Sequence, residues 1–254
     1  MMKTLQSMLL VVCLLALPGV SHALGFEVAV GGWWQNPSGH IGYEATGVND
    51  RLDLERDAGY GKELRPMGRI KVDMPLTIPN IYLMATPMEF SGTGSKTSTF
   101  TFGDQTFAAD TPFTSETKLD QYDAALYYGV PVLGLATLGT VNVDLGINVR
   151  FMEVDAVVQQ GSDSYTRSVS LAVPMIYLGL QITPVERYSL ELEGRAISFS
   201  GNRYVDLLAR LKVKAFGPVF AAAGWRHQDV KIDARGVDAS FKVGGPFLET
   251  GFAF

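Results

Sequence analysis

Two histidines and a neighbouring acid are the residues best suited to catalysis in this chain. His227 and Asp229 are two residues apart, and on a β-strand that spacing puts both side chains on one face. An acid beside a histidine can orient the ring as a general base, so a hydrolase site at the rim of a β-structure is one hypothesis. His40 is the other histidine beyond residue 23. No nucleophile or second acidic pair stands at fixed spacing from them, which favours rim residues that face solvent.

Motifs for other chemistry are absent from the sequence. There is no Gly-x-Ser-x-Gly elbow, no His-Glu-x-x-His zinc motif and no phosphate-binding loop. The acidic segment 49–57 lacks the spacing and the glycine of a calcium loop. The only cysteine, Cys13, lies in an apolar run near the N-terminus, so the rest of the chain has no thiol and no disulfide. We therefore predict no catalytic residue, no metal site, no cofactor and no enzymatic activity.

The first 23 residues have the three parts of a secretory signal peptide. Lys3 supplies a positive charge, residues 8–17 form an unbroken apolar run, and residues 21–23 (Ser-His-Ala) form a small-x-small cleavage site. The run is shorter than the ~20 residues that a membrane-spanning helix needs. We expect removal of residues 1–23, which leaves residues 24–254 as the mature domain.

The mature chain has properties that limit its partners. It loses Lys3 from 21 basic residues, so its net charge is 20 − 26 = −6, which does not suggest a nucleic-acid partner. No later stretch approaches the ~18 apolar residues that would indicate a transmembrane helix. If the chain lies in a membrane it must form a closed barrel, because lipid cannot hydrogen-bond to a free sheet edge.

Apolar and polar residues alternate with a period of two, which elementary strand geometry explains. In residues 141–151 the odd positions are apolar and the even positions are mostly polar, and residues 205–215 repeat this pattern apart from Leu208. Short turns and longer loops also alternate, as in outer-membrane barrels with their long loops outside the cell. The predicted fold is an all-β, transmembrane, antiparallel up-and-down barrel of about ten strands. The predicted strands are 24–35, 62–76, 80–92, 118–130, 140–154, 166–181, 185–199, 203–216, 218–232 and 237–254.

The charged face of these strands is expected to point into the lumen, because Lys or Arg at the bilayer midplane costs about 2–4 kcal/mol. Opposite charges from neighbouring strands should then pair, since an unpaired buried charge is expensive. Two interpretations stay open: a polar core filled by its own side chains, which the narrow lumen favours, and a thin pore. The candidate lumen-lining residues are Asp144, Arg150, Glu191, Glu193, Arg195, Asp206, Arg210 and Lys212.

Tyr and Trp residues near strand ends are expected to form aromatic girdles at the two membrane interfaces. A soluble lipocalin-like barrel is the competing fold, and it would place the apolar face inside and the charges outside. The loop asymmetry and the aromatic residues on the apolar face favour the membrane barrel. The girdle candidates are Trp33, Trp34, Tyr128, Tyr188, Tyr204 and Trp225.

The last strand is expected to close the barrel against the strand that carries Gly31 and Gly32. Leu248 and Phe252 should face lipid, and Phe254 should act as the signal that the barrel assembly machinery recognises. The other expected partners are outer-membrane lipid and lipopolysaccharide. The protein is predicted to be a monomer in the cell outer membrane.

Several short motifs carry a family resemblance. They are Val30-Gly31-Gly32-Trp33-Trp34, Leu52-Asp53-Leu54-Glu55, Met74-Pro75-Leu76, Pro79-Asn80-Ile81-Tyr82-Leu83, Asp123-Ala124-Ala125-Leu126-Tyr127-Tyr128 and Val143-Asp144-Leu145-Gly146-Ile147-Asn148. Taken in order, they resemble the family of Gram-negative outer-membrane β-barrel proteins marked by an N-terminal Gly-Gly pair. The resemblance implies an integral outer-membrane barrel, and it brings no activity, ligand or catalytic residue.

Two functional hypotheses remain besides the rim hydrolase. The first is a structural barrel or a narrow passive passage for small solutes. The second is a surface-binding or adhesion protein that acts through loops 36–61 and 93–117.

Overall fold

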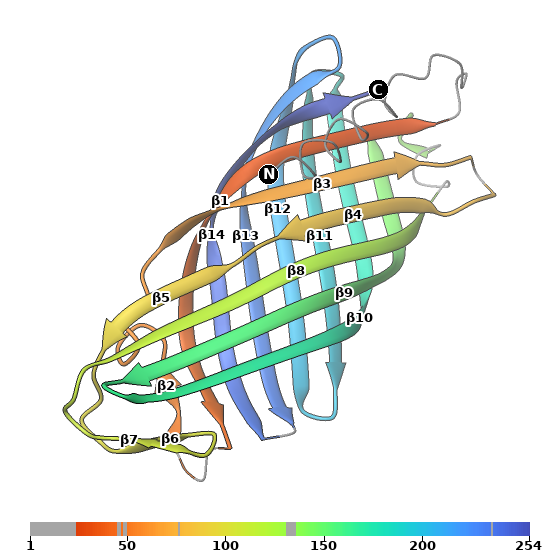
Figure 1. Cartoon of the computed structure of the whole chain (residues 1–254). Helices are drawn as coiled ribbons and strands as arrows, with labels where there is room; N and C mark the ends of the chain where they lie inside the picture. The colour runs from red at the N-terminus through yellow and green to blue at the C-terminus, as the bar shows by residue number, and fades with distance from the viewer. Residues whose placement is uncertain (1–23, 45–46, 48–49, 76, 131–135, 235) are drawn as a thin grey trace, which may run out of the picture.

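The chain forms a closed antiparallel β-barrel of ten strands (Figure 1). The computed structural model describes residues 24–44, 47, 50–75, 77–130, 136–234 and 236–254, so the predicted signal peptide lies outside the described residues. β5 continues β4 along the same neighbour, β8, and the two together count as one barrel strand. The barrel strands are β1 (Gly25–Tyr43), β3 (Glu63–Asp73), β4 (Asn80–Thr86) with β5 (Glu89–Gly94), β8 (Phe113–Gly129), β9 (Val141–Gln160), β10 (Asp163–Val185), β11 (Tyr188–Phe199), β12 (Asn202–Phe216), β13 (Val219–Ala234) and β14 (Val237–Ala253).

The first and last strands close the barrel, as the sequence predicts. β14 pairs with β1 in antiparallel register, with Glu249 opposite Gly31 and Leu248 opposite Gly32. A Cβ atom on Gly31 would lie 2.1 Å from the carbonyl oxygen of Leu248, so this closing contact requires glycine. Backbone hydrogen bonds between Phe26 and Phe254 extend the pairing to the barrel end where β1 begins and β14 ends (Figure 1).

The strands run further toward the loop end than the sequence predicts. Residues 36–43 belong to β1, so the first loop is shorter than the predicted 36–61, and β8 likewise takes residues 113–117 from the predicted loop 93–117. There Phe113 is buried and Ile41 and Tyr43 pack against the core, so apolar side chains face inward instead of outward. This change of phase interrupts the alternation that the sequence shows nearer the membrane. Within the loops, β2 (Leu52–Asp53) pairs with β1, and β6 (Phe100–Phe102) pairs with β7 (Gln105–Phe107) to form a short ribbon.

The β6–β7 ribbon lies across the loop end of the barrel. Its Gly103 amide donates to the carbonyl of Tyr43 in β1, while Ala108 exchanges hydrogen bonds with the Gln160 side chain at the end of β9. β1 and β9 are four positions apart in the ring of ten strands, and so lie on nearly opposite sides of the barrel. The ribbon therefore bridges the outer opening.

The barrel wall opens slightly between β3 and β5. The pairing of β3 with β4 covers residues 68–72 of β3 and ends at Gly68. Among the described strands β5 pairs with β8 and not with β3, and Pro87 separates β4 from β5. Proline cannot donate to a ladder, which explains the break at this predicted strand interior. Two side chains bridge the gap, since Arg65 donates to the carbonyl of Glu89 and Gln35 donates to that of Pro87.

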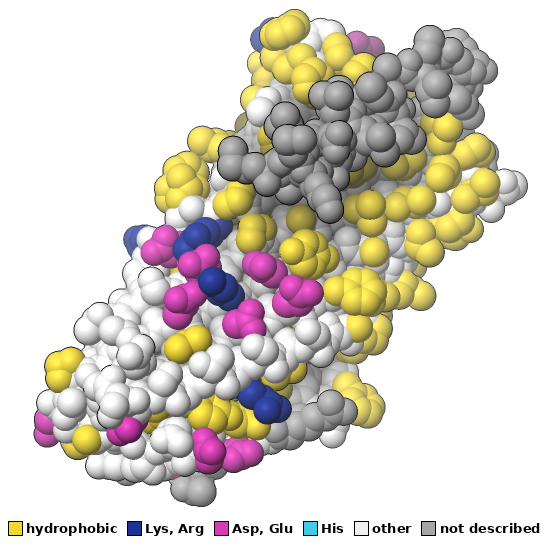
Figure 2. All heavy atoms as spheres, in the orientation of Figure 1, with side chains coloured by type: hydrophobic (Ala, Val, Ile, Leu, Met, Phe, Trp, Pro, Cys, Tyr) yellow, Lys and Arg dark blue, Asp and Glu magenta, His cyan; other side chains and the backbone are white. Residues whose placement is uncertain are grey.

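The outer wall changes from apolar to polar at one level. On β8 the outward series passes from exposed Tyr122 to Asp120, and on β9 it passes from exposed Phe151 to Glu153. These residues are cross-strand partners, so the change falls on one row. Figure 2 shows the apolar side chains over the half near the termini and polar ones toward the ribbon end. A closed barrel with such an apolar belt fits a bilayer that ends at this row.

Candidate functional site

The lumen near the termini holds a dense network of ion pairs centred on Arg210. Its Nε lies 2.7 Å from Glu191 Oε2 and its Nη1 lies 3.1 Å from Glu249 Oε1, and it also pairs with Glu193. Arg69 pairs with Glu249 at 2.8 Å. The strands β3, β11, β12 and β14 thus send side chains of opposite charge to one point. The further pairs are Arg69–Glu27, Lys71–Glu193, Lys212–Glu27 and Lys212–Glu191.

A second network sits deeper in the barrel, around the carboxylate of Asp206. Arg226 contacts both of its oxygens, at 3.0 and 2.7 Å, and Arg150 binds Oδ2 as well. Arg150 also binds Asp123 through two hydrogen bonds and lies over the ring of Tyr204, 4.8 Å from its centroid. The carboxylates of Asp206 and Asp123 together balance the charges of Arg226 and Arg150, and this pairing offsets part of the cost of burying them.

Arg195 lies near both networks, with Tyr82 and Tyr177 against its guanidinium group. The guanidinium carbon is 4.9 Å from the Tyr82 ring centroid and 5.3 Å from that of Tyr177. Its Nη2 lies 3.2 Å from Glu193 Oε2. Asp144 differs from the other lumen candidates, since it is half-buried and makes no ion pair within the described residues.

The lumen is packed with its own side chains in this region. Arg150, Arg195 and Arg226 are 0% exposed and Arg210 is 1% exposed. A water-filled channel past these groups would leave their surfaces accessible. Seven of the eight predicted lumen residues thus meet in paired clusters, and their alternation with lipid-facing neighbours explains why they point inward.

Two girdle predictions are wrong. Trp33 and Tyr204 are 0% and 4% exposed and point into the lumen, where Trp33 donates to the carbonyl of Gly245. Strand parity explains both, because Trp33 shares the face of Glu27, and Tyr204 shares the face of Asp206. Trp34, Tyr128, Tyr188 and Trp225 lie exposed on the outer wall.

Sequence reasoning missed Arg226, which is a central member of the Asp206 network. Its neighbour Trp225 is exposed on the outer wall, so alternation along β13 places Arg226 inside. Gln121 and Gln228 were missed as well, and each donates an amide hydrogen to the side-chain oxygen of the other. All three residues lie on the strand face opposite an apolar series, and this position is the sequence signal that could have identified them.

The histidines do not form a catalytic arrangement. Both oxygens of Asp229 accept hydrogen bonds from Arg203 at 2.9 Å, so Asp229 is engaged away from His227. His40 Nε2 lies 3.7 Å from Asp238 Oδ1. Among the described residues there is no group of three or more His, Cys, Asp or Glu that could hold a metal ion.

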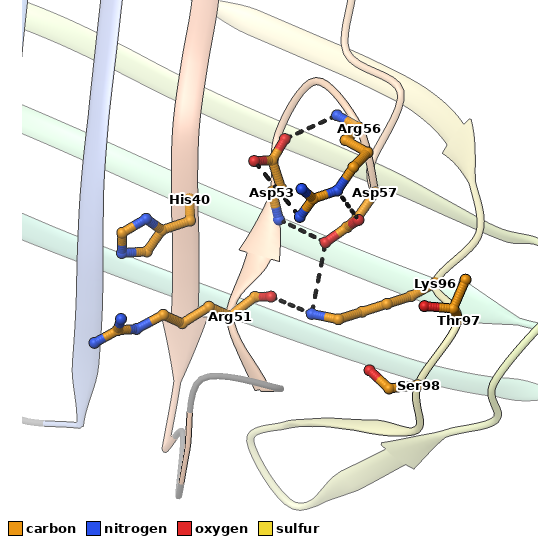
Figure 3. Close-up of a pocket in the computed structure, with 8 residues that line it drawn as sticks. All are labelled: His40, Arg51, Asp53, Arg56, Asp57, Lys96, Thr97 and Ser98. Carbon is orange, nitrogen blue, oxygen red and sulfur yellow. Dashed lines mark hydrogen bonds and ion pairs between the residues drawn. The ribbon is translucent and has the colours of Figure 1, made fainter.

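A polar pocket of about 370 Å³ opens at the outer end of the molecule (Figure 3). It is built by the end of β1, the turn after β2 and the segment before β6. The turn is set by Asp53, whose Oδ1 accepts hydrogen bonds from the amides of Glu55 and Arg56. The lining residues are His40, Arg51, Asp53, Arg56, Asp57, Lys96, Thr97 and Ser98.

The pocket carries charges of both signs close together. Asp57 accepts from Arg56 at 3.0 Å and lies 3.5 Å from Lys96, which also binds the carbonyl of Arg51. Burial alone would raise the pKa of Asp57, but hydrogen bonds from Arg56 and from the Asp53 amide, with the charge of Lys96, hold that pKa below its usual value. Lys96 thus joins the two long loops.

Comparisons with solved structures give similarities at low sequence identity. No protein-family model matches the chain, and no curated protein matches it. The translocator domain of the autotransporter NalP from Neisseria meningitidis is similar with a TM-score of 0.41 and 12% identity, covering 99% of this chain and 96% of that one. Ail, the attachment invasion locus protein of Yersinia pestis, has a TM-score of 0.38 and 9% identity over 92% of this chain and 100% of its own. Neisserial surface protein A has a TM-score of 0.33 and 14% identity over 93% and 100%.

The assignment of the fold rests on the molecule itself: a closed barrel of ten strands, in which β1 begins and β14 ends at the same barrel end, with an apolar belt outside. The protein is an outer-membrane β-barrel. None of the described residues forms a helix long and apolar enough to cross a membrane. Membership of the Gly-Gly family, the monomeric state and recognition of Phe254 during assembly stay predictions.

Proposed function

We propose that this protein is a sealed barrel that acts at the cell surface and does not conduct solutes. The observation that carries the proposal is that the barrel is closed twice. Ion pairs fill the lumen around Arg210 and Asp206, and the β6–β7 ribbon bridges the outer opening. Such a barrel serves as a rigid support for what it presents outside.

The pocket between the long loops is the part of the support that can act on a ligand. Its cations and acids nearly balance, and Thr97 and Ser98 add hydroxyl groups. It therefore offers both hydrogen-bond donors and acceptors with little net charge. These properties suit an uncharged ligand rich in hydroxyl groups, such as a sugar.

Planar-bilayer recording tests the sealed lumen. The purified full-length protein should give no single-channel steps across a wide voltage range, while a general porin inserted in the same bilayer should give them. Steady steps from the wild-type protein would establish a passage and overturn this part of the proposal.

A pocket-filling variant tests the surface-binding role. Ser98→Trp adds a large side chain at the pocket lining and leaves the Asp57–Lys96 ion pair in place. Ser162→Trp, in the β9–β10 turn, is the matched control. On an array of oligosaccharides the wild-type protein and Ser162→Trp should retain the same sugars, and Ser98→Trp should lose them. Equal retention by all three proteins, or by none, would contradict a sugar site in this pocket.

A further inference from the structure

A second depression lies on the outer wall of the barrel, where the chain closes on itself. It spans β1, β14 and β13 and encloses about 560 Å³. None of its lining residues belongs to the loop pocket, so the two sites are separate. We call it the seam groove, and it is lined by Trp34, Asn36, Ser38, Lys62, Trp225, His227, Lys242, Gly244, Gly245 and Pro246.

The seam groove straddles the level at which the outer wall changes from apolar to polar. Trp34 and Trp225 form its membrane side and are 40% and 56% exposed. The next outward row on the loop side contains Asn36, Gly244 and His227, which are cross-strand neighbours. One side of the groove thus suits hydrocarbon and the other suits a polar headgroup, with indole rings at the boundary.

Two glycines give the seam groove its depth. A Cβ atom on Gly244 would project toward His227 and lie 3.2 Å from Nδ1, so any side chain there would occupy the groove. At the neighbouring Gly245 a Cβ atom would lie 1.8 Å from the carbonyl oxygen of Trp34, and the backbones approach too closely for another residue. The floor is therefore bare backbone.

The polar side of the seam groove is basic. Lys62 and Lys242 line it, and neither makes an ion pair or side-chain hydrogen bond with any residue that the structure describes. No Asp or Glu lines the groove, and the nearby Asp229 is held by Arg203. On β8 and β9 the same border carries acids, Asp120 and Glu153, which are cross-strand partners.

We propose that the seam groove binds the phosphorylated headgroup of an acylated glycolipid in the outer leaflet. A phosphate between Lys62 and Lys242 would supply the anion that these ammonium groups lack. The acyl chains would lie along Trp34, Trp225 and the apolar belt below them. A ligand with one anionic end and one hydrocarbon end matches both sides of the groove. An ordinary zwitterionic phospholipid matches the polar side less well, because its own ammonium group balances its single phosphodiester charge.

Native mass spectrometry of the detergent-solubilised full chain tests the proposal, with bisphosphorylated lipid A as the probe. A phosphate-free analogue and phosphatidylethanolamine are the comparison lipids. Wild-type protein should retain the bisphosphorylated probe at least tenfold more tightly than either. Lys62→Gln with Lys242→Gln, and separately Gly244→Leu, should reduce that affinity at least tenfold by removing the charge or the space.

The matched control is Lys118→Gln with Lys231→Gln, which removes the same charge from exposed positions outside the groove and should leave affinity unchanged. Heat-modifiable migration in gels confirms that each variant is folded. If Gly244→Leu does not fold, the lysine pair alone decides the question. Equal binding of the phosphate-free analogue, or equal losses in the control and test pairs, would overturn the proposal.

Discussion

The two halves of the lumen are filled by different means. Toward the end where β14 finishes, buried charges pair with one another, both between adjacent strands, as Arg210 does with Glu191, and between strands that are not neighbours, as Arg150 does with Asp206. Toward the loops, aromatic and aliphatic side chains take their place, including Phe90 and Phe113 from the wall and Phe107 from the ribbon. In the membrane the outside must be apolar, so alternation leaves the polar residues inside. Beyond the membrane the outside is wet, and the inside can form an ordinary apolar core.

This contrast predicts that the two halves fail differently when damaged. Loss of one charge in the inner half leaves partners that cannot reach water. Loss of one ring in the outer half leaves a cavity beneath a loop, and the loop can open without the barrel. The predictions below test this difference, from the largest expected effect to the smallest.

Removal of the shared carboxylate should be the most damaging single change. Asp206→Asn keeps the shape but leaves Arg226 without its anion and Arg150 with only Asp123. Breaking a buried pair in this way costs about 3–5 kcal/mol. Guanidinium unfolding of the protein in detergent, followed by tryptophan fluorescence, should show a loss of this size in the free energy of unfolding. A loss below about 1 kcal/mol, the usual value of an exposed pair, would mean that water reaches the network.

Truncation of a ribbon ring should weaken the outer half alone. Phe107 is fully buried and stacks on Phe100 with ring centroids 5.1 Å apart. Phe→Ala in a core costs about 3–5 kcal/mol, and we expect this cost to appear as local opening of the loop. Phe107→Ala should therefore expose residues 95–112 to proteinase K while the melting of the barrel is unchanged. Phe199→Ala is the control, because the Phe199 ring is exposed. A lower melting temperature of the barrel in Phe107→Ala would show that the two halves are coupled.

The sequence predicted this arrangement unevenly, and the reasons differ by residue. Side chains alternate along a strand, so Arg210 and Asp206 lie on the face opposite the apolar series. A charged face toward lipid is costly, and the sequence therefore places both residues inside. Trp33 and Tyr204 were assigned by residue type, although their parity pointed inward. An aromatic ring suits both a lipid interface and a cation inside the barrel, so type cannot decide its face.

The pairing partners and both pockets needed the three-dimensional structure. Arg226 and Asp206 are 20 residues apart, and which charges meet depends on strand register and shear. The seam groove joins Trp34 to Trp225 across the barrel closure, and no local pattern in the sequence links these positions.

Acid should destabilise the loop around Asp57 in the wild-type protein, and it should have little effect on the same loop in Asp57→Asn. The pKa of Asp57 is lowered in the folded loop, so its ionised form stabilises the loop fully above the ordinary aspartate pKa of about 3.9. That contribution is lost as the pH falls through the lowered pKa. Hydrogen-exchange protection factors for residues 53–60 should therefore be constant from pH 6 to about pH 4 and drop at lower pH. In Asp57→Asn they should be low already at pH 6 and change little, and an equal drop in both proteins would assign the acid response to other groups.

The exposed pair Arg203–Asp229 should have the smallest effect and completes the comparison with Asp206. Arg203 donates to both carboxylate oxygens of Asp229 at 2.9 Å, which is favourable hydrogen-bond geometry, but the Arg203 side chain is 51% exposed. Water solvates either partner when the other is removed, so Arg203→Gln should cost about 0.2–1 kcal/mol in the same unfolding assay. The two carboxylates belong to adjacent strands, β12 and β13, and both are bound by arginine, so burial is the main difference between them. If Arg203→Gln costs as much as Asp206→Asn, burial does not decide the strength of these pairs, and the outer wall at this level is shielded from water.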